Sequence, residues 1–279
     1  MSGAVRAPEP STVMAQARHE NFPVASLLVP KRVRAHLLAV YGFARLVDDA
    51  GDEVAGDRLA LLDELETDLE RVWGGAPRNP LIARLQVTVS TRDLPIEPFR
   101  KLIEANRRDQ LDDRYETYED LLGYCELSAN PVGELVLRIF GAATPERLAL
   151  SDKVCSALQL TEHWQDVGED YVRGRIYLPL EDLRRFGVPE ADLGASAASP
   201  AVRSLMEFEV RRARELLDEG APLVRSLSGR AKLAVAAFVA GGRSALGAIE
   251  RGGYQVLGAP PRAGRARRAL EAVRTLIRG

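Results

Sequence analysis

Two groups of acidic residues in the 279-residue chain have a spacing that suits metal chemistry. Residues three or four positions apart share one face of a helix, and this relation joins the members of the first group: Tyr41, Arg45, Asp48 and Asp52. Carboxylates at this spacing repel each other, and burial increases the cost. A divalent cation would convert the repulsion into attraction, so the first group predicts a cation site. An ion pair of Arg45 with Asp48 or Asp49 is the structural alternative.

The second group lies in QLTEHWQDVGEDY, where Glu162, Asp166 and Asp170 are four residues apart. Gln159 lies one turn before them. Two helices that present carboxylates to one cavity would offer oxygen ligands to Mg²⁺, which takes its remaining ligands from water and phosphate. Such an ion suits a diphosphate leaving group, because it neutralises the charge that develops as a carbon–oxygen bond breaks. By spacing alone, a metal site and a set of structural ion pairs are equal alternatives.

Apolar periodicity and capping residues predict an all-α chain. We expect helices over 31–50, 57–73, 80–91, 95–108, 117–140, 144–171, from 200 onward, and 228–252. Pro95 is expected in a first turn, and Pro131 is expected to kink the helix that contains it.

The helix expected over 57–73 carries a third acidic stripe. Its leucines recur at helical spacing on one side, and its acids occupy the other. This arrangement is typical of a solvated helix face, so no metal chemistry is assigned to these residues: Asp63, Glu66 and Glu70.

The composition limits the classes of function. Hydrophobic residues make up 46% and charged residues 28%, an ordinary globular balance, and the net charge of −2 gives no basic excess for a nucleic-acid partner. Cys125 and Cys155 lack CxxC spacing and are expected to be reduced core residues. The N-terminal segment lacks the apolar core of a signal peptide, and the longest apolar run, 233–240, is too short to span a bilayer. We therefore expect a cytoplasmic protein.

The segment 261–279 predicts a helix with a basic side and an apolar side. Six arginines oppose the single Glu271, and apolar residues recur at three- and four-residue steps: Ala266, Leu270, Val273 and Ile277. Two interpretations remain open. The segment is either a final helix docked on the domain, or a peripheral attachment to anionic lipid at the inner face of the membrane.

Four segments resemble the squalene/phytoene synthase family, in the family's order: NFPVASLLVP, YGFARLVDDAGDE, YCELSANPVGELVL and QLTEHWQDVGEDYVRGRIYLP. The resemblance covers residues 18–256. It implies a single-domain, all-α isoprenoid synthase fold, with helices around a central apolar cavity. Residues 1–17 are then expected to be a flexible N-terminus, and 257–279 a basic amphipathic tail.

By position, the resemblance also implies ligands for Mg²⁺ and contacts to a prenyl diphosphate substrate. The metal ligands would be Asp48, Asp52, Asp166 and Asp170, with Glu162 standing where the family usually has Asn. The substrate contacts would be Asn21, Phe22, Tyr41, Arg45, Gln159, Arg173 and Arg175. Tyr124 is expected to lie near a developing carbocation and so to act in catalysis with the aspartates, core packing being the alternative.

Within the family, HENFPVAS, SANPVG and WQDV resemble the hydroxysqualene-forming branch of bacterial hopanoid synthesis. That branch implies conversion of presqualene diphosphate and water to hydroxysqualene and diphosphate. One alternative is head-to-head condensation of two prenyl diphosphates, such as farnesyl diphosphate, to presqualene diphosphate, squalene or phytoene. A second is a non-catalytic scaffold relative, which retention of both acidic motifs disfavours.

Overall fold

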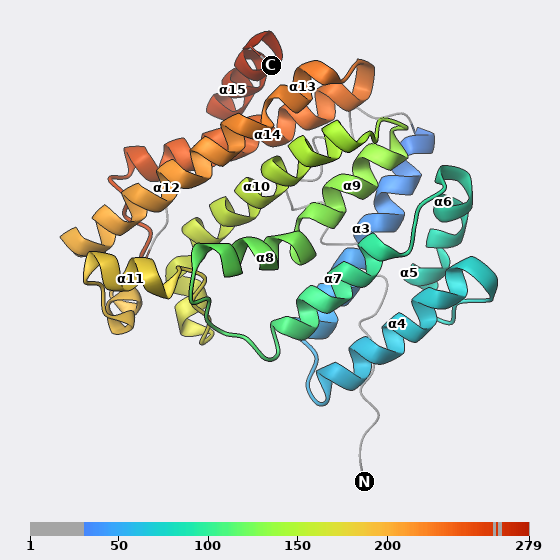
Figure 1. The fold of residues 1–279 in the computed structure, drawn as a ribbon, viewed down its shortest axis with the longest axis horizontal. Coiled ribbons are helices and arrows are strands. Elements are labelled where there is room, and N and C mark those ends of the chain that lie inside the picture. Colours follow the sequence, from blue (N-terminus) through green and yellow to red (C-terminus); the bar gives the residue numbers. More distant parts are fainter. Residues whose placement is uncertain (1–30, 259–260, 262–263, 279) are drawn as a thin grey trace. The chain divides into compact units, whose positions relative to one another are not determined.

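The computed structural model describes residues 31–258, 261 and 264–278, and this part of the chain contains helices and one isolated bridge, Arg114–Ile176, but no strand. The all-α prediction is confirmed. In chain order the elements are α3 (Lys31–Asp52), α4 (Arg58–Gly74), α5 (Pro80–Ala83), α6 (Leu85–Arg92), α7 (Glu97–Arg108), α8 (Tyr118–Ser128), α9 (Asn130–Ile139), α10 (Pro145–Val172), α11 (Leu180–Phe186), the 3₁₀ helix η1 (Glu190–Gly194), α12 (Pro200–Gly220), α13 (Pro222–Ser226), α14 (Gly229–Arg251) and α15 (Arg265–Arg278) (Figure 1).

Proline and local capping explain where the expected helices differ. The helix expected over 117–140 breaks at Ala129, because Pro131 has no N–H to continue the ladder and lies in the first turn of α9 instead. The helix expected from Pro95 begins at Glu97, since Pro98 is tolerated only in a first turn. The helix expected over 80–91 is divided at Arg84 into α5 and α6. The capping box of Thr117 and Asp120 is confirmed.

The described residues fall into two compact units, which are described separately. Unit 1 is formed within Met1–Leu111 and Pro131–Thr144, and unit 2 within Asp112–Asn130 and Pro145–Gly279. The expected flexible N-terminus, 1–17, lies outside the described residues.

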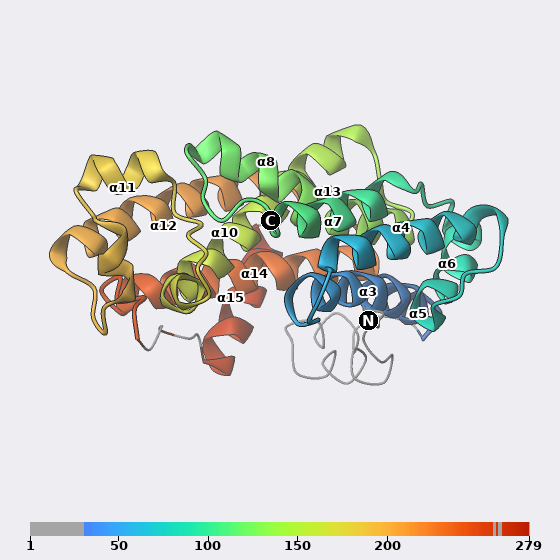
Figure 2. The same ribbon diagram turned by 90° about the horizontal axis from the view of Figure 1, so that it is seen from below.

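The core of unit 1 determines which face of α3 is buried. Phe43, Leu46 and Val47 are fully buried, and the Phe43 ring meets Phe99 of α7 edge-on at 5.3 Å. α3 packs on α4, α5, α6 and α7 (Figure 2). Because these apolar residues occupy one side of α3, the positions of Asp48 and Asp52 fall on the opposite side, where both are exposed.

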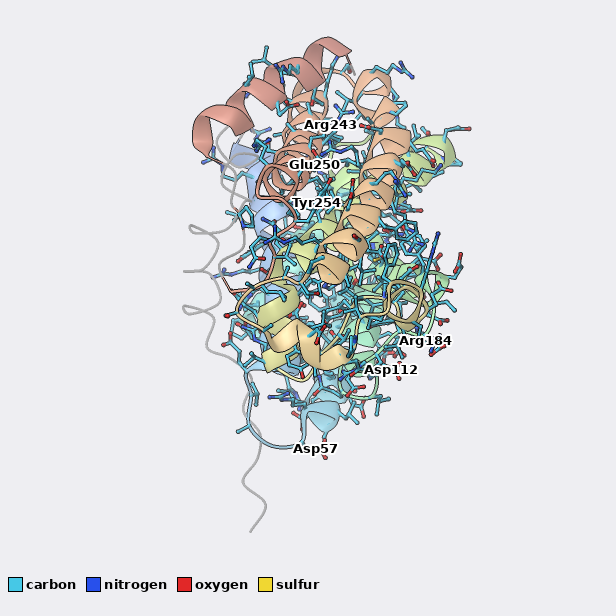
Figure 3. The ribbon with its side chains drawn as sticks, turned by 90° about the vertical axis from the view of Figure 1, so that its left-hand side faces the viewer. Asp57, Asp112, Arg184, Arg243, Glu250 and Tyr254 are labelled. Atoms are coloured by element: carbon cyan, nitrogen blue, oxygen red, sulfur yellow. The ribbon has the colours of Figure 1, made fainter. Side chains whose placement is uncertain are left out.

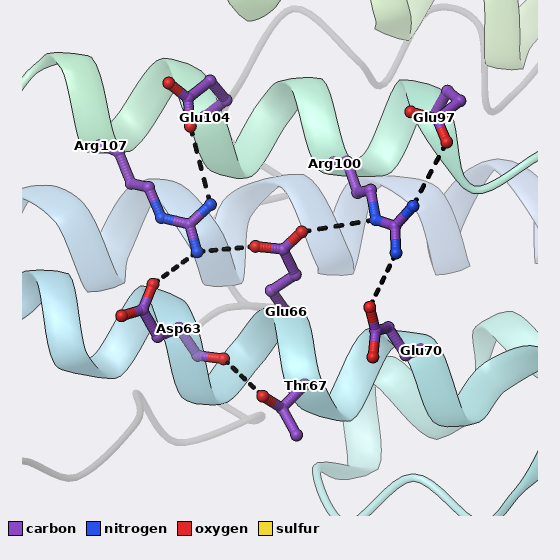
Figure 4. Close-up of polar contacts among 8 residues, drawn as sticks. All are labelled: Asp63, Glu66, Thr67, Glu70, Glu97, Arg100, Glu104 and Arg107. Atoms are coloured by element: carbon purple, nitrogen blue, oxygen red, sulfur yellow. Dashed lines mark hydrogen bonds and ion pairs between the residues drawn. The ribbon is translucent and has the colours of Figure 1, made fainter.

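The acids of α4 are neutralised by arginines of α7 (Figure 4). Arg107 Nη2 lies 2.6 Å from Asp63 and 2.7 Å from Glu66, and Arg100 Nη2 lies 2.7 Å from Glu70. Arg100 Nε also approaches the second oxygen of Glu66 at 3.4 Å. The stripe expected to be plain solvated surface is therefore an ion-pair network between two helices.

Unit 2 is built around α10, against which α12 and α14 pack (Figures 1 and 2). Two glycines permit α12 and α14 to approach α10 closely. A Cβ on Gly220 of α12 would lie 2.8 Å from Val154, and one on Gly242 of α14 would lie 2.7 Å from Leu158. By length and composition α14 could cross a membrane, but 61% of its apolar window is buried inside this unit.

A buried charge cluster joins α11 to α12. Arg212 Nη1 lies 3.0 Å from Asp182 and 3.4 Å from Glu209, and its guanidinium covers the ring of Tyr118 at 4.0 Å. Glu209 is fully buried. Burial raises the pKa of Glu209 to about 8, with Arg212 opposing the rise and Asp182 adding to it. Two acids therefore share one arginine here.

Candidate functional site

The first acidic stripe lies on α3, in unit 1. Asp48 Oδ1 accepts a hydrogen bond from Asn106 Nδ2 of α7 at 3.1 Å. Reduced hydration raises the pKa of Asp48 to about 6, Asp52 and Asp49 raise it further, and Asn106 and Arg45 oppose the rise. The side chain still reaches solvent, so the surrounding protein limits its hydration without enclosing it. The carboxylate is thus poorly compensated by its surroundings, and a cation would stabilise it.

Arg45 is held by two acids of its own helix. Its Nε lies 2.6 Å from Asp49 Oδ1, and its Nη2 lies 3.3 Å from Glu53 Oε1. Asp49 is buried, with 2% of its surface exposed. The ion-pair alternative is therefore present, at Asp49 and Glu53, and not at Asp48. A guanidinium has five N–H donors in a planar fork, so these contacts orient Arg45.

The second acidic stripe lies on α10, in unit 2. Trp164 and Val167 on the same helix are buried, Asp166 and Asp170 are half-buried, and Glu162 is exposed. Reduced hydration raises the pKa of Asp170 to about 7, with Asp166 adding to the rise and Arg173 and Arg175 opposing it. In the described part of the chain, neither Asp48 nor Asp170 forms an ion pair within 4.0 Å.

The basic loop after α10 begins directly beside this stripe. The Arg175 backbone N–H donates to Asp170 O at 2.9 Å, and the Ile176 N–H donates to Asp113 O at 3.0 Å. Arg173 is exposed and Arg175 half-buried. A small pocket is lined by Asp170 and Arg175 together with His163, Tyr177 and aliphatic side chains. The structure thus brings together Asp170, an expected metal ligand, and Arg175, an expected substrate contact, at one pocket.

An aromatic cluster adjoins this pocket. The ring of His163 stacks on Tyr177 at 3.7 Å, and Tyr124 lies 5.9 Å from Tyr177 and 5.5 Å from Tyr115. Tyr124 is buried, with 5% of its surface exposed. Gln159 Nε2 lies 3.1 Å from His163 Nε2. Burial, with Arg175 nearby, lowers the pKa of His163 to about 3, so the imidazole is neutral at pH 7.

Two expected contact residues, Asn21 and Phe22, lie outside the described residues. Tyr41 is buried on α3, with 8% of its surface exposed. Sequence reasoning did not select Asn106 or His163. The only signal for His163 was its place one turn after Gln159 on the acidic helix. No sequence signal relates Asn106 to Asp48, because 58 residues separate them.

The donor set fits magnesium rather than a metal that needs a closed protein cage. Within the described ranges, no three His, Cys, Asp or Glu side chains form a group that could hold a metal ion by themselves. Mg²⁺ keeps several waters and is typically bound through one or two carboxylates plus substrate phosphates. The acids of the α3 stripe in unit 1 and of the α10 stripe in unit 2, with raised pKa values at Asp48 and Asp170, are donors of this kind.

Comparison with known proteins identifies relatives by sequence. Residues 15–271 match the family model described as Squalene/phytoene synthase. A hydroxysqualene synthase of Rhodopseudomonas palustris is 36% identical over 214 residues, covering 75% of this chain and 72% of the relative. A 15-cis-phytoene synthase of Synechococcus elongatus is 35% identical over 227 residues, with the same coverage of 75% and 72%.

Among solved structures, the squalene synthase HpnC from Alicyclobacillus acidocaldarius superimposes with a TM-score of 0.82 at 47% sequence identity. The match covers 86% of this chain and 92% of that one. The all-α architecture is that of the isoprenoid synthase fold. The family consists of enzymes of isoprenoid biosynthesis that bind prenyl diphosphates. On the matched residues and the shared fold, the chain belongs to the squalene/phytoene synthase family.

Proposed function

We propose that this chain converts presqualene diphosphate and water to hydroxysqualene and diphosphate, with Mg²⁺ as its cofactor. One observation carries the magnesium assignment. The two acidic stripes each contain a carboxylate whose pKa is raised, to about 6 at Asp48 and to about 7 at Asp170, so a cation beside it would stabilise the ionised form. The acids of α4 have the same spacing but are paired with arginines.

The proposed Mg²⁺ ligands are Asp48 and Asp52 on α3 of unit 1, and Asp166 and Asp170 on α10 of unit 2, with Glu162 at the end of the second stripe. When bound, the ion would neutralise the negative charge that develops on the leaving diphosphate. Arg45, Arg173 and Arg175 would bind diphosphate oxygens by charge-assisted hydrogen bonds. Arg45 is pre-oriented for this role by Asp49 and Glu53.

The hydrocarbon part of the reaction needs an apolar, electron-rich wall and little water. Tyr124, Tyr177 and the neutral His163 form an aromatic cluster in unit 2 that would serve as this wall. Their π-faces can stabilise a cation without reacting with it. Gln159, beside His163, is polar but uncharged and can orient a hydroxyl or a water molecule.

The proposed reaction balances without a reductant. The carbon–oxygen bond to diphosphate breaks with its electron pair on oxygen, the cyclopropane of presqualene opens, and water adds to the resulting cation with loss of one proton. Squalene formation would instead require a hydride. The 36% identity to a hydroxysqualene synthase supports this reaction. The 35% identity to a phytoene synthase supports the second candidate, head-to-head condensation of two prenyl diphosphates.

Product analysis separates the two reactions. The purified chain, with Mg²⁺, should be given presqualene diphosphate, farnesyl diphosphate or geranylgeranyl diphosphate in parallel, with ¹⁸O-labelled water. We expect an ¹⁸O-labelled C30 alcohol from presqualene diphosphate alone. Phytoene from geranylgeranyl diphosphate, or presqualene diphosphate accumulating from farnesyl diphosphate, would assign the chain to condensation. No product from any substrate would favour the scaffold alternative. Repeating each arm with excess chelator tests the magnesium requirement.

A further inference from the structure

Helix α15 docks on α14 without using all of its apolar side. Thr275 is fully buried, and its Oγ1 accepts a hydrogen bond from Arg243 Nη1 of α14 at 3.2 Å. Leu270 and Val273, in contrast, are 50% and 54% exposed. A helix held only by burial of its apolar stripe would cover these two residues first. The docked helix therefore carries an unpartnered apolar surface.

The same helix is strongly basic. Its sequence, RARRALEAVRTLIR, contains five arginines against one glutamate, and that Glu271 is paired with Arg274 at 2.8 Å. The helix carries a net charge of +4, whereas the whole chain, this helix included, carries −2. The positive charge is therefore a local feature of this part of the surface. Apolar residues combined with concentrated arginine are typical of helices that lie in the interface of an anionic membrane.

A polar groove at the α12, α14 and α15 end of unit 2 extends the basic surface. Each of its three acids is paired with an arginine: Asp218 with Arg243, Glu250 with Arg214, and Glu271 with Arg274. Arg243 and Glu250 mark this part of α14 in Figure 3. The fourth arginine, Arg251, is exposed and forms no ion pair in the described part of the chain. Its guanidinium lies over Gly247, which has no side chain to displace it.

We propose that the outer side of α15, with Arg251 beside it, is a docking surface for an anionic lipid bilayer. The net positive charge of the helix attracts the phosphates of the headgroups, and Leu270 and Val273 enter the apolar boundary beneath them. A free phosphate would account for the arginines but not for the exposed apolar residues. This inference does not depend on the proposed reaction, because it concerns a surface of unit 2 that the reaction does not use.

Vesicle sedimentation with the full-length protein tests the proposal. The protein should bind vesicles of phosphatidylcholine mixed with phosphatidylglycerol at low salt. Binding should fall at least about tenfold at high salt, because screening shortens the reach of surface charge. Vesicles of phosphatidylcholine alone should bind far less. Equal binding to both vesicle types would overturn the electrostatic part of the proposal.

Two variants test the surface itself. Leu270→Gln with Val273→Gln should weaken binding to the anionic vesicles at least about fivefold, and Arg251→Gln should weaken it by a smaller factor with a shallower salt dependence. Val87→Gln is the matched control, since Val87 is 67% exposed on α6 of unit 1. All variants should retain wild-type circular dichroism, because the substituted side chains are exposed.

Three results would overturn the proposal: wild-type vesicle binding by the double variant, displacement of the vesicles by millimolar inorganic phosphate, or a change of oligomeric state in the double variant. The last result would assign the surface to contact between copies of the chain. Turnover of detergent-dispersed substrate should be the same in the double variant as in the wild type. A failure of the proposed reaction would therefore be seen separately from a failure of membrane docking.

Discussion

The acids of α4 and those of α3 have the same helical spacing but meet different partners from α7. On α4, Asp63 and Glu66 each lie within 2.7 Å of an Arg107 nitrogen (Figure 4). On α3, the partner of Asp48 is the neutral amide of Asn106. Both partners come from α7. Helix α7 therefore directs arginines to the acids of α4 and a neutral amide to Asp48 of α3.

This difference shows that the spacing of acids does not identify a metal site by itself. An acid that has an arginine partner loses its need for a metal, whereas one that meets an amide retains it. The stripe of α10 resembles that of α3, since the pKa of Asp170 is raised to about 7 despite Arg173 and Arg175. The Asp182 and Glu209 cluster is intermediate, because two acids share one arginine.

The largest effect is expected from neutralising an acid of the α3 stripe or of the α10 stripe. Asp48→Asn and Asp166→Asn should each lower turnover at least about 100-fold, because removal of a group that stabilises transition-state charge typically costs that much. Asp63→Asn, on the compensated stripe, should leave turnover unchanged. Diphosphate release and circular dichroism measure the two properties separately. Near-normal turnover in either site variant would contradict a requirement for carboxylates from both helices.

A smaller effect is expected at Glu162, the exposed end of the α10 stripe. Glu162→Asn should retain much of the activity, because the amide oxygen can still ligate. Glu162→Ala should lose about tenfold or more, as is typical when a group supporting a metal ion is removed. Glu126→Ala, an exposed acid of α8, serves as the control. If both Glu162 variants were fully active at limiting Mg²⁺, Glu162 would have no part in the site.

The buried cluster in which Asp182 and Glu209 share Arg212 predicts that the stability of the fold depends on pH. The pKa of Glu209 is raised in the folded state from 4.5 to about 8, so the unfolded chain ionises first as pH rises. The cluster's contribution to folding is then complete below pH 4.5 and is lost as pH rises through about 8. Glu209→Gln should flatten the fall in Tm over this range, and Glu215→Gln, exposed on the same helix, should not. Parallel pH profiles for wild type and Glu209→Gln would exclude the cluster as the cause.

The smallest effect, a change in the free energy of unfolding, is expected from the acids of α4, which are paired with arginines. Glu66→Gln weakens contacts to both Arg100 and Arg107, which should cost about 1 kcal/mol of unfolding free energy, the upper range for surface ion pairs. Glu64→Gln, exposed on the same helix, should cost less. Urea unfolding measures both. Turnover should be unaffected in each, and a loss of turnover in Glu66→Gln would mean that the α4 stripe also serves the site.

Much of the candidate site could be predicted from the sequence because its acidic residues lie a few positions apart on single helices. Asp48 and Asp52, or Asp166 and Asp170, share a helix face by spacing alone. Their partners could not be predicted in this way. The contact of Arg107 with Asp63 joins residues 44 apart, and that of Asn106 with Asp48 joins residues 58 apart. No local pattern shows that α7 directs arginines to α4 and an amide to α3.

The sequence by itself determined most of the helices, the capping box of Thr117 and Asp120, the two acidic motifs and the family, since each depends on residues within a few turns of one another. Only the tertiary structure decided the rest. It paired Arg45 with Asp49, placed His163 against Tyr177, and left Leu270 exposed on a docked helix. The physical reason is that a helix forms through bonds from residue to residue four positions on, whereas charge compensation and burial depend on which distant side chains the packing brings into contact.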